Sequence, residues 1–544
     1  MKHNNFRRNA ITLVVILCTM YNVQSQNTPF SVTIEPLNIS NLGGIQSYAV
    51  GQSNGKWLIV GGRLDGLHRR QPWAAFDVAG NNNQLIVVDP VNQQTWSTSL
   101  SSLPTPIQEQ LSSTNMEFYQ EGDYLYFLGG YGFSATANDH ITYPNLTAIK
   151  VPDVINGIIN QTSITSYFRQ ITDTLFEVTG GRLKKINNNY HLLGGQKFIG
   201  RYNPNGPNNG PGFIQEYTNS IRIFTINDDG TNITINHIQQ HIDTVNLHRR
   251  DYNAGQQIMP NEEEGITMFS GVFQQNADLP FLNCVNVDSS GYVVNNSFQQ
   301  YYNHYHCPVL PIYSATNNEM HTVFFGGIAQ YYDSNGTLVQ DDNVPFVNTI
   351  ARVTRNSAGV MTEYKLPITM PALLGSGAEF IPNLTIPHYN NEVFKLDSLT
   401  DGDTVLIGYI YGGISSTAPN IFFINDGTQS SASSQIFKVF ITKGDVLSID
   451  ELNVNSTNSL NMTVYPNPAN QNITVNYNLK KSSNVKISIF DIQGKLITLV
   501  KLNNISSGEH SEKINIESLT NKSIYIIQVE TEYERFIEKI IIED

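Results

Sequence analysis

One short pattern recurs six times in this 544-residue chain and restricts the folds it can adopt. Each copy is an apolar, strand-like stretch that ends in two adjacent glycines or in a serine followed by a glycine. The terminal pairs are Gly61-Gly62, Gly129-Gly130, Gly194-Gly195, Ser270-Gly271, Gly326-Gly327 and Gly412-Gly413. The copies lie 56 to 86 residues apart, which suits a repeating unit of four strands with generous loops. The pattern therefore predicts an architecture built from six similar β-units.

A second apolar stretch follows most of the glycine pairs after about 20 to 30 residues. These stretches are Leu85–Asp89, Leu146–Val151, Ile221–Asn227, Leu282–Asp288, Ile350–Arg355 and Ile436–Ile441. Asn-, Asp- and Gly-rich turns separate them, and no long amphipathic helix is evident. Charged residues make up only 14% of the chain, whereas Gly and the aromatic residues are abundant. We therefore expect an all-β protein with more than one domain.

The repeat resembles the kelch repeat, in which each unit is one propeller blade of four antiparallel strands. In that family the glycine pair ends the second strand, and a Trp follows the third. The first copy fits best, because Val87–Pro90 is followed by Trp96, and the fourth has Arg250 and Ala254 at family positions. The other copies lack that Arg and Trp. The resemblance covers about residues 30–443 and implies a six-bladed kelch-like β-propeller.

The last repeat is one strand short. Its second strand falls near 405–412 and its third near 435–441, with no fourth strand before the linker. Ser31–Glu35 is a strand-like stretch with no unit of its own. We expect it to supply the outer strand of the last blade, which would close the ring and leave no exposed blade edge at the seam.

The N-terminus has the three-part plan of a secretory signal. Lys2, Arg7 and Arg8 precede an apolar run from Ala10 to Met20, which is too short to span a bilayer permanently. Cleavage before Gln26 is predicted, so residues 1–25 are a signal peptide and 26–443 form the propeller. The mature chain then has 29 basic and 46 acidic residues, a net charge of −17.

The C-terminal segment differs from the repeats in composition and in strand pattern. An Asn-, Ser- and Thr-rich linker at 444–463 precedes six short strands in 464–544, which predict an Ig-like β-sandwich. This segment resembles the C-terminal sorting domain (type A) of type IX secretion cargo; the matching residues are Tyr465, Pro466, Asn467, Pro468, Asp491 and Gly494. The resemblance implies two partners, the outer-membrane type IX translocon and its sorting peptidase. The protein is then secreted or attached to the outer-membrane surface.

Other partners and cofactors are constrained by what the sequence lacks. A net charge of −17 argues against a nucleic-acid partner, which needs a basic face. No segment is long and apolar enough for a transmembrane helix. No phosphate-binding loop, dinucleotide fingerprint or nucleophile elbow is present. His304 and His306 would share one strand face, but Cys307 would point away, so we predict no metal site and no cofactor.

The first strand of each blade lines the central channel of a propeller, so polar residues there are candidates for ligand binding. Those residues are Glu117, Arg182, Arg250, Asp251, His304, His306 and Glu379. Arginine holds a carboxylate in a bidentate pair, and Glu can transfer protons. The alternative is that channel-lining strands are hydrated and tolerate polar residues without a ligand. No catalytic residue is assigned.

Three functions remain open. The first is a surface propeller that binds a glycan or protein ligand at the channel mouth and through long loops such as Arg201–Gly212 and 381–404. The second is a carbohydrate-active enzyme, because some secreted six-bladed kelch propellers are sialic acid epimerases. The third is a structural surface or matrix protein. The ligand is not identified by the sequence.

The mature chain keeps two cysteines, and we predict that they do not form a disulfide. Cys284 falls on the third strand of the fourth blade and Cys307 on the innermost strand of the fifth. A third strand is about 9–10 Å from the first, and a disulfide needs Cα atoms within about 7 Å. Both thiols should be buried as small apolar groups.

Overall fold

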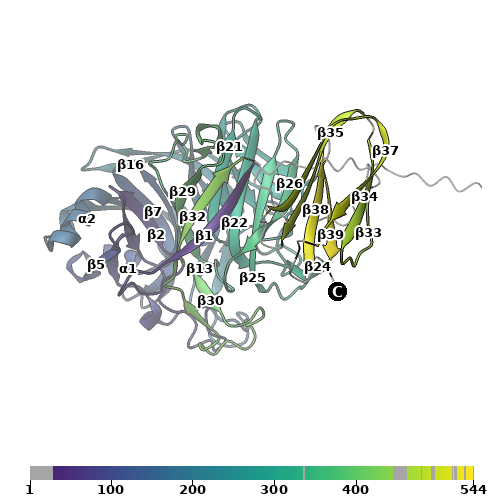
Figure 1. The fold of residues 1–544 in the computed structure, drawn as a ribbon. Coiled ribbons are helices and arrows are strands. Elements are labelled where there is room, and N and C mark those ends of the chain that lie inside the picture. Colours follow the sequence, from purple (N-terminus) through teal and green to yellow (C-terminus); the bar gives the residue numbers. More distant parts are fainter. Residues whose placement is uncertain are drawn as a thin grey trace, which may run out of the picture. The chain divides into compact units, whose positions relative to one another are not determined.

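The computed structural model describes residues 29–334, 337–444, 462–479, 481–491, 496–517, 519, 524–531 and 535–542. The predicted signal peptide, most of the predicted linker and Gly494 lie outside these residues. The chain divides into two compact units: Thr28–Val446, and a second one that contains Leu447–Asp544. Both are built almost entirely of strands, so the protein is all-β (Figure 1).

Six antiparallel sheets with at least four strands each make up the larger unit, which has a β-propeller-like fold. Sheet one contains β2 (Ala49–Ser53), β3 (Lys56–Val60), β4 (Gln84–Asp89) and β5 (Gln94–Ser99). Sheet two contains β6 (Thr114–Glu121), β7 (Tyr124–Ser134), β9 (Asn145–Lys150) and β10 (Phe168–Thr172), with β8 (Asp139–Thr142) beside β7. Sheet three contains β11 (Arg182–Ile186), β12 (Asn189–Leu193), β15 (Ser220–Asp228) and β16 (Ile233–Ile242).

The remaining three sheets follow the same plan. Sheet four contains β17 (Asn253–Ile258), β18 (Glu264–Phe269), β19 (Cys284–Asp288) and β20 (Gly291–Asn295). Sheet five contains β21 (Val309–Ser314), β22 (Glu319–Ile328), β25 (Phe346–Arg355) and β26 (Met361–Thr369), with β28 (Phe394–Lys395) parallel to β21. Sheet six contains β27 (Ala378–Pro382), β29 (Thr404–Gly412), β32 (Ile436–Lys443) and β1 (Phe30–Leu37).

Short elements decorate the connections between these strands. Three hairpins pair β13 (Gln196–Ile199) with β14 (Ile214–Tyr217), β23 (Tyr331–Ser334) with β24 (Thr337–Gln340), and β30 (Ile414–Ser416) with β31 (Ser430–Ala432). The helices are α1 (Thr105–Leu111), α2 (Val151–Asn160) and five 3₁₀ turns at Val78–Gly80, Leu100–Ser102, Thr165–Tyr167, Thr174–Phe176 and Leu396–Ser398. The strand predicted over 146–151 ends at Lys150, because Pro152 starts a helix whose buried face packs on the core between sheets one and two.

The recurring glycine pairs connect each sheet to the next one. The N–H of the second residue donates to a carbonyl of the following sheet or of the segment before it, over 2.7 to 3.2 Å. The six bonds are Gly62 to Ser113, Gly130 to Val178, Gly195 to Arg249, Gly271 to His304, Gly327 to Leu374 and Gly413 to Ile45. The last of them runs from sheet six back to the residues before sheet one.

A second cycle of hydrogen bonds joins the starts of the innermost strands. Each N–H donates to the carbonyl of the preceding sheet over 2.7 to 3.4 Å. The cycle runs from Asn115 to Ser47, Gly180 to Asn115, Asp251 to Gly180, His306 to Asp251, Gly377 to His306, and Ser47 to Gly377. We call these six residues the inner ring. All except His306 have a φ between 50° and 70°, so the ring depends on left-handed backbone at its members.

The hydrophobic core follows the same cyclic order. Six clusters of buried apolar residues each join two successive sheets, and one of them joins sheet six to sheet one. Strand β1 lies along β32, with Val32 opposite Ile441 (Figure 1, purple beside green). Phe30 and Val32 are buried in the cluster between sheets five and six. The N-terminal strand thus covers the edge of sheet six.

The smaller unit is a β-sandwich with one core. One sheet contains β33 (Thr463–Tyr465), β34 (Asn472–Leu479) and β37 (Gly508–Asn515). The other contains β36 (Leu496–Ile505), β35 (Ser483–Asp491), β38 (Ile524–Glu530) and β39 (Arg535–Ile541). Alternate residues of both sheets, such as Val475 and Ile487, are buried in a shared cluster. Within the described part of the chain, no helix has the length and apolar character to cross a membrane.

Candidate functional site

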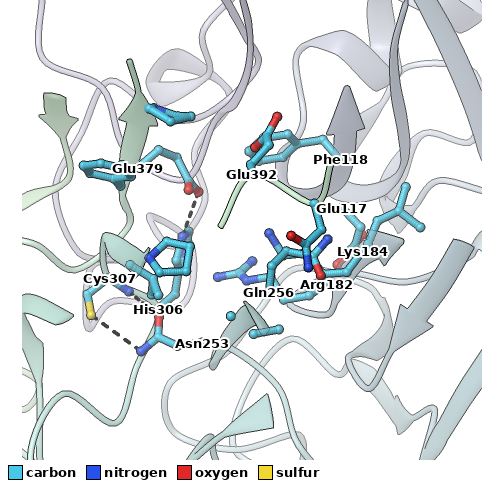
Figure 2. Close-up of a pocket in the computed structure, with 18 of the residues that line it drawn as sticks. Glu117, Phe118, Arg182, Lys184, Asn253, Gln256, His306, Cys307, Glu379 and Glu392 are labelled. Atoms are coloured by element: carbon cyan, nitrogen blue, oxygen red, sulfur yellow. Dashed lines mark hydrogen bonds and ion pairs between the residues drawn. The ribbon is translucent and has the colours of Figure 1, made fainter. Parts of the chain in front are cut away.

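A cavity of about 120 Å³ lies among the innermost strands of the larger unit. Five of the six sheets line it, together with the long connection between β27 and β29. Its polar lining residues are Glu117, Arg182, Lys184, Asn253, Gln256, His306, Glu379, Asn391 and Glu392. Figure 2 shows Glu379 and His306 on one side and Glu117, Arg182 and Lys184 on the other.

The inner ring explains why these side chains meet. Residues two apart on a strand point to the same side. Glu117, Arg182 and Glu379 each stand two positions after a ring residue. Asn253 occupies the same position in sheet four, and Ala49 in sheet one. Equivalent backbone positions in four different sheets therefore present two carboxylates, one guanidinium and one amide to the cavity.

Glu117 and Arg182 form the first polar wall, and each keeps one atom without a partner. Oε1 of Glu117 accepts a hydrogen bond from the Gly181 N–H at 2.7 Å, and Nη1 of Arg182 donates to the Gly181 carbonyl at 3.1 Å. Oε2 of Glu117 and Nη2 of Arg182 are buried and have no hydrogen-bond partner in the protein. Burial raises the pKa of Glu117 well above its usual value, which favours the protonated form of this carboxyl.

His306 and Glu379 form the opposite wall. Nε2 of His306 lies 2.7 Å from Oε1 of Glu379. Burial, followed by the charge of Arg182, lowers the pKa of His306. Burial pushes the pKa of Glu379 upward, but His306, by its charge and its hydrogen bond, and Arg182 more than offset this and leave the pKa below its usual value. The pKa values of the two carboxyls are therefore shifted in opposite directions, upward for Glu117 and downward for Glu379.

The connection between β27 and β29 supplies the third side of the cavity. In sheets one to three the same connection is a two-residue turn, whereas here it spans 383–403. We call it the strap. Asp397 anchors it by accepting hydrogen bonds from Ser314 Oγ and the Thr316 N–H, both at 2.9 Å. At its tip, Glu392 has a φ of 64° and lines the cavity, and burial raises the pKa of its carboxyl.

Lys184 lies two residues beyond Arg182 and lines the same cavity. Burial, followed by the charge of Arg182, lowers its pKa from 10.5. The sequence-based prediction did not include Lys184, Gln256 or Glu392. Lys184 could have been predicted from Arg182, because residues two apart on a strand point to the same side of the sheet. Nothing in the sequence indicates that the strap folds back over the channel.

Three of the seven predicted residues lie elsewhere. Arg250 and Asp251 form an ion pair with each other, and Arg250 Nε also donates to Tyr217 Oη at 3.0 Å. The Arg250 N–H donates to the carbonyl of Val272, which lies in the connection that follows β18, whereas Arg250 itself lies in the connection between β16 and β17. Neither residue lines the cavity, because both precede the first inward-facing position of β17.

His304 has a structural role. Its Nε2 donates to the Gln300 carbonyl at 2.9 Å, and its Nδ1 accepts from the Gln330 N–H at 3.0 Å. Burial lowers its pKa to about 4, so the ring is neutral at physiological pH. His304 and His306 do not share one strand face, because β21 begins only at Val309. No cluster of three potential metal ligands exists among the described residues.

Both mature cysteines are free and buried, which confirms the prediction of no disulfide. Cys284 and Cys307 belong to the hydrophobic cluster between sheets four and five. Cys307 also lines the cavity, where its Sγ accepts from Asn253 Nδ2 at 3.5 Å. Burial raises the pKa of each thiol to about 12, so neither provides a thiolate nucleophile at neutral pH.

The sorting-motif residues of the smaller unit lie around its first strand. Asn467 joins the motif to the last strand: its Nδ2 donates to the Lys539 carbonyl at 2.7 Å and its Oδ1 accepts from the Ile541 N–H at 2.9 Å. Tyr465 is half exposed at the end of β33. Pro466 lies between Tyr465 and Asn467, Pro468 follows Asn467, and Asp491 is the last residue of β35.

Comparison with known proteins identifies the C-terminal part. Residues 463–543 match the model of the secretion system C-terminal sorting domain. The protein is therefore secreted or attached to the outer-membrane surface, and its sorting domain implies interaction with the secretion system. No curated protein matches the chain.

Solved structures give only a distant likeness. One is "Structure of YjhT", at 10% identity and a TM-score of 0.39, covering 75% of this chain and 99% of that one. Another is the WD40 domain of SCAP from fission yeast, at 8% identity and a TM-score of 0.28, covering 94% and 90%. A third is an exo-1,5-alpha-L-arabinanase from a bovine ruminal metagenomic library, at 7% identity and a TM-score of 0.23, covering 74% and 95%.

Proposed function

We propose that the mature chain is a surface propeller of six kelch-like blades that binds a small polar ligand, a glycan unit bearing a carboxylate, in its channel. The six sheets, the two cycles of hydrogen bonds and the cyclic order of the cores support six blades. The glycine pairs lie at the end of the second strand in four sheets and within it in β7 and β22, which resembles their place in kelch repeats. The sorting domain, which we infer to be Ig-like, delivers this propeller outside the cell.

The unpartnered atoms of Glu117 and Arg182 carry the proposal. A buried polar atom without a hydrogen bond costs about 1–3 kcal/mol, and more when the group is charged. Two such atoms side by side on one wall of a cavity represent a cost that a bound ligand would remove. A guanidinium with a free Nη2 suits a carboxylate, and the proton of Glu117 suits an oxygen acceptor of the same ligand.

The opposite wall complements this pair. The carboxylate of Glu379 accepts hydrogen bonds, and the amide of Gln256 both donates and accepts, as sugar hydroxyls require. The cavity is compact, at about 120 Å³, which favours a single sugar unit or the end of a chain over an extended polymer.

A thermal-shift panel of the purified mature protein tests the proposal. The probes are glucuronate, galacturonate and N-acetylneuraminate, with glucose and galactose as uncharged controls. At 100 times its Kd a ligand stabilises the folded state by about 2.7 kcal/mol. We expect an acidic sugar to raise the Tm of the wild type and of Lys150→Met, a surface control, but not of Arg182→Met. A panel without any shift would favour the structural surface role instead.

A second candidate is catalysis on a sugar, favoured by the protonation difference across the cavity. A protonated Glu117 faces the His306–Glu379 pair, so an acid and a base stand on opposite walls. Anomer interconversion or epimerisation needs a group that donates a proton on one side and one that accepts on the other. In this scheme Glu117 protonates the ring oxygen while His306, hydrogen-bonded to Glu379, takes the proton of the anomeric hydroxyl, and the bond between the ring oxygen and the anomeric carbon breaks. Closure of the ring on the other face of the carbonyl returns both protons.

Incubation with the α-anomer of N-acetylneuraminate, followed by NMR, tests this second candidate. Loss of a positioned acid typically costs about 10²–10⁴-fold in rate. The enzyme hypothesis predicts faster anomer equilibration than in buffer, and loss of that acceleration in Glu117→Gln. Equal rates with protein and with buffer would leave the binding function alone.

A further inference from the structure

We propose that a second surface, separate from the channel, binds acidic polysaccharide. It is formed by Arg69, Arg70, Trp73, Arg201 and Phe423, which we call the arginine–aromatic surface. These residues belong to three connections, the ones between β3 and β4, between β13 and β14, and between β30 and β31. The proposal does not depend on a ligand in the channel.

Hydrogen bonds hold the three connections together. The Arg70 N–H donates to the Asn425 carbonyl at 2.8 Å, and Asn425 Nδ2 donates to the His68 carbonyl at 2.9 Å. Arg201 Nη1 donates to the backbone carbonyl of Trp73. The surface is thus fixed by hydrogen bonds to backbone atoms, which leaves the Trp73 ring free to contact a partner.

Two aromatic rings are exposed on this surface. The side chains of Trp73 and Phe423 are 72% and 66% exposed, the highest values for aromatic residues in the described part of the larger unit. The guanidinium of Arg70 lies 5.1 Å from the centre of the Phe423 ring. Large apolar groups left in water on connections that are joined to one another are typical of an interaction site.

The charge of the surface is unusual for this protein. The mature chain has a net charge of −17, yet none of the arginines at 69, 70 and 201 lies within 4 Å of a carboxylate among the described residues. Asp426, in the connection between β30 and β31, accepts hydrogen bonds from the N–H and Oγ1 of Thr428. Three unpaired guanidiniums favour an anionic partner.

The mixture of single rings and arginines favours a polysaccharide over a protein. A stable protein interface buries about 800 Å² on each side around a continuous apolar centre. Here the rings are separated by charges, which suits sugar units that stack on ring faces while their carboxylates pair with guanidiniums. Nucleic acid carries a denser negative charge, which the net charge of −17 would repel.

The surface and the strap lie at opposite ends of the strands. The residues of the arginine–aromatic surface lie in segments that join the second strand of a sheet to its third strand. The strap instead joins the innermost strand of sheet six to its second strand. Because neighbouring strands are antiparallel, those two sets of connections emerge at opposite ends of each sheet. Variants of one site should therefore leave the other intact.

Binding of the full mature chain to polygalacturonate, measured by biolayer interferometry, tests the proposal. The same polymer with fully methyl-esterified carboxyls is the uncharged probe. We expect wild type and Arg182→Met to bind polygalacturonate equally, with affinity falling as NaCl rises. Trp73→Ala and the double variant Arg69→Gln/Arg70→Gln should each lose at least tenfold in affinity and keep the wild-type Tm.

Three results would overturn the inference: no binding of polygalacturonate by the wild type, equal binding of the esterified polymer, or unchanged binding by the Trp73 and arginine variants. Tighter binding of single-stranded oligo-dT than of polygalacturonate would also contradict it, because it would make the partner a nucleic acid. Loss of polygalacturonate binding in Arg182→Met would assign it to the channel instead.

Discussion

At the scale of single residues, the glycine pairs explain how six similar units close on one another. The first glycine of a pair has left-handed backbone, and it leaves no room for a side chain. A Cβ at Gly129 would lie 1.8 Å from the Val178 carbonyl oxygen of the next sheet. A Cβ at Gly122 would meet nothing within 4 Å, although its φ of 55° is also left-handed. Substitution at Gly122 therefore tests the cost of left-handed backbone alone, and substitution at Gly129 tests that cost plus the clash with the neighbouring segment.

We predict that Gly129→Ala lowers the free energy of unfolding by about 3 kcal/mol or more, because it adds a steric clash to the left-handed strain. Gly122→Ala is the matched control and should cost only the strain, about 1 kcal/mol. Urea unfolding followed by circular dichroism measures both. Equal losses in the two variants would show that the glycine pair serves backbone conformation alone.

Glu392 gives the opposite prediction, a substitution that stabilises. It combines left-handed backbone with a buried carboxyl, and both features cost free energy. Glu392→Gly should therefore raise the Tm. Glu262→Gly is the control, because Glu262 has a φ of 67° but an exposed side chain. A gain at 392 no larger than at 262 would mean that burial of the Glu392 carboxyl carries no cost.

The residues of the candidate site were predictable only in part. Glu117, Arg182, His306 and Glu379 meet in one cavity, and the repeat itself indicated three of them, since equivalent strand positions follow the glycine pairs at similar distances. Arg250, Asp251 and His304 do not line this cavity. They precede the cavity-lining residues Asn253 and His306 by two or three positions and lie before β17 and β21 begin, and the exact start of a strand is not readable from the sequence.

At the scale of elements, β1 covers the edge of sheet six. Removing it would expose the ladder of β32 and would delete Phe30 and Val32 from the core. We predict that a chain lacking residues 26–37 unfolds several kcal/mol more easily than one lacking only residues 26 and 27, and that it aggregates. Urea titration and light scattering measure this. Equal stability of the two chains would show that the edge needs no cover.

Two elements were not predicted from the sequence, for different reasons. Helix α2 contains several β-branched residues and Gly157, which disfavour helix, and it forms because its apolar face packs on the core of sheets one and two. The strap was recognised only as a long insertion. Its path over the channel is set by a two-residue parallel pairing of β28 with β21, a long-range contact without a sequence signature.

At the scale of the whole molecule, buried histidines make the fold sensitive to acid. Burial lowers the pKa of His191 and His304 to about 4 and that of His321 to about 3. As pH falls from about 6.5, the unfolded chain binds protons that the folded chain does not bind, so stability is lost across the window from about 6.5 down to these values. Each histidine should contribute about 1.4 kcal/mol per pH unit within it.

Urea unfolding at pH 7.5, 6.0, 5.0 and 4.5 measures this slope. His191→Phe, which removes one of the buried histidines with a lowered pKa, should make this slope shallower than in the wild type. A stability that stays constant between pH 6.5 and 4.5 would contradict the assignment of neutral, buried imidazoles.

The general architecture was accessible from the sequence because it rests on a repeated local signal. Turn residues, strand periodicity and the glycine pairs recur in every unit, and together they predict the all-β, propeller-like fold. The C-terminal sorting domain was recognisable from a compact motif at one end of the chain. The cavity was less accessible, because its chemistry depends on which side chains are left without partners after packing, and that is a property of the folded chain.

The central claim, that Arg182 holds the carboxylate of a channel ligand, is tested most directly by calorimetry on one sugar acid and its methyl ester. The acid used is the one that gives the largest shift in the thermal panel. We predict that the wild type prefers the acid to the ester by at least about tenfold in Kd, which corresponds to about 1.4 kcal/mol. Arg182→Met should bind both alike. The same preference in wild type and variant would contradict the account.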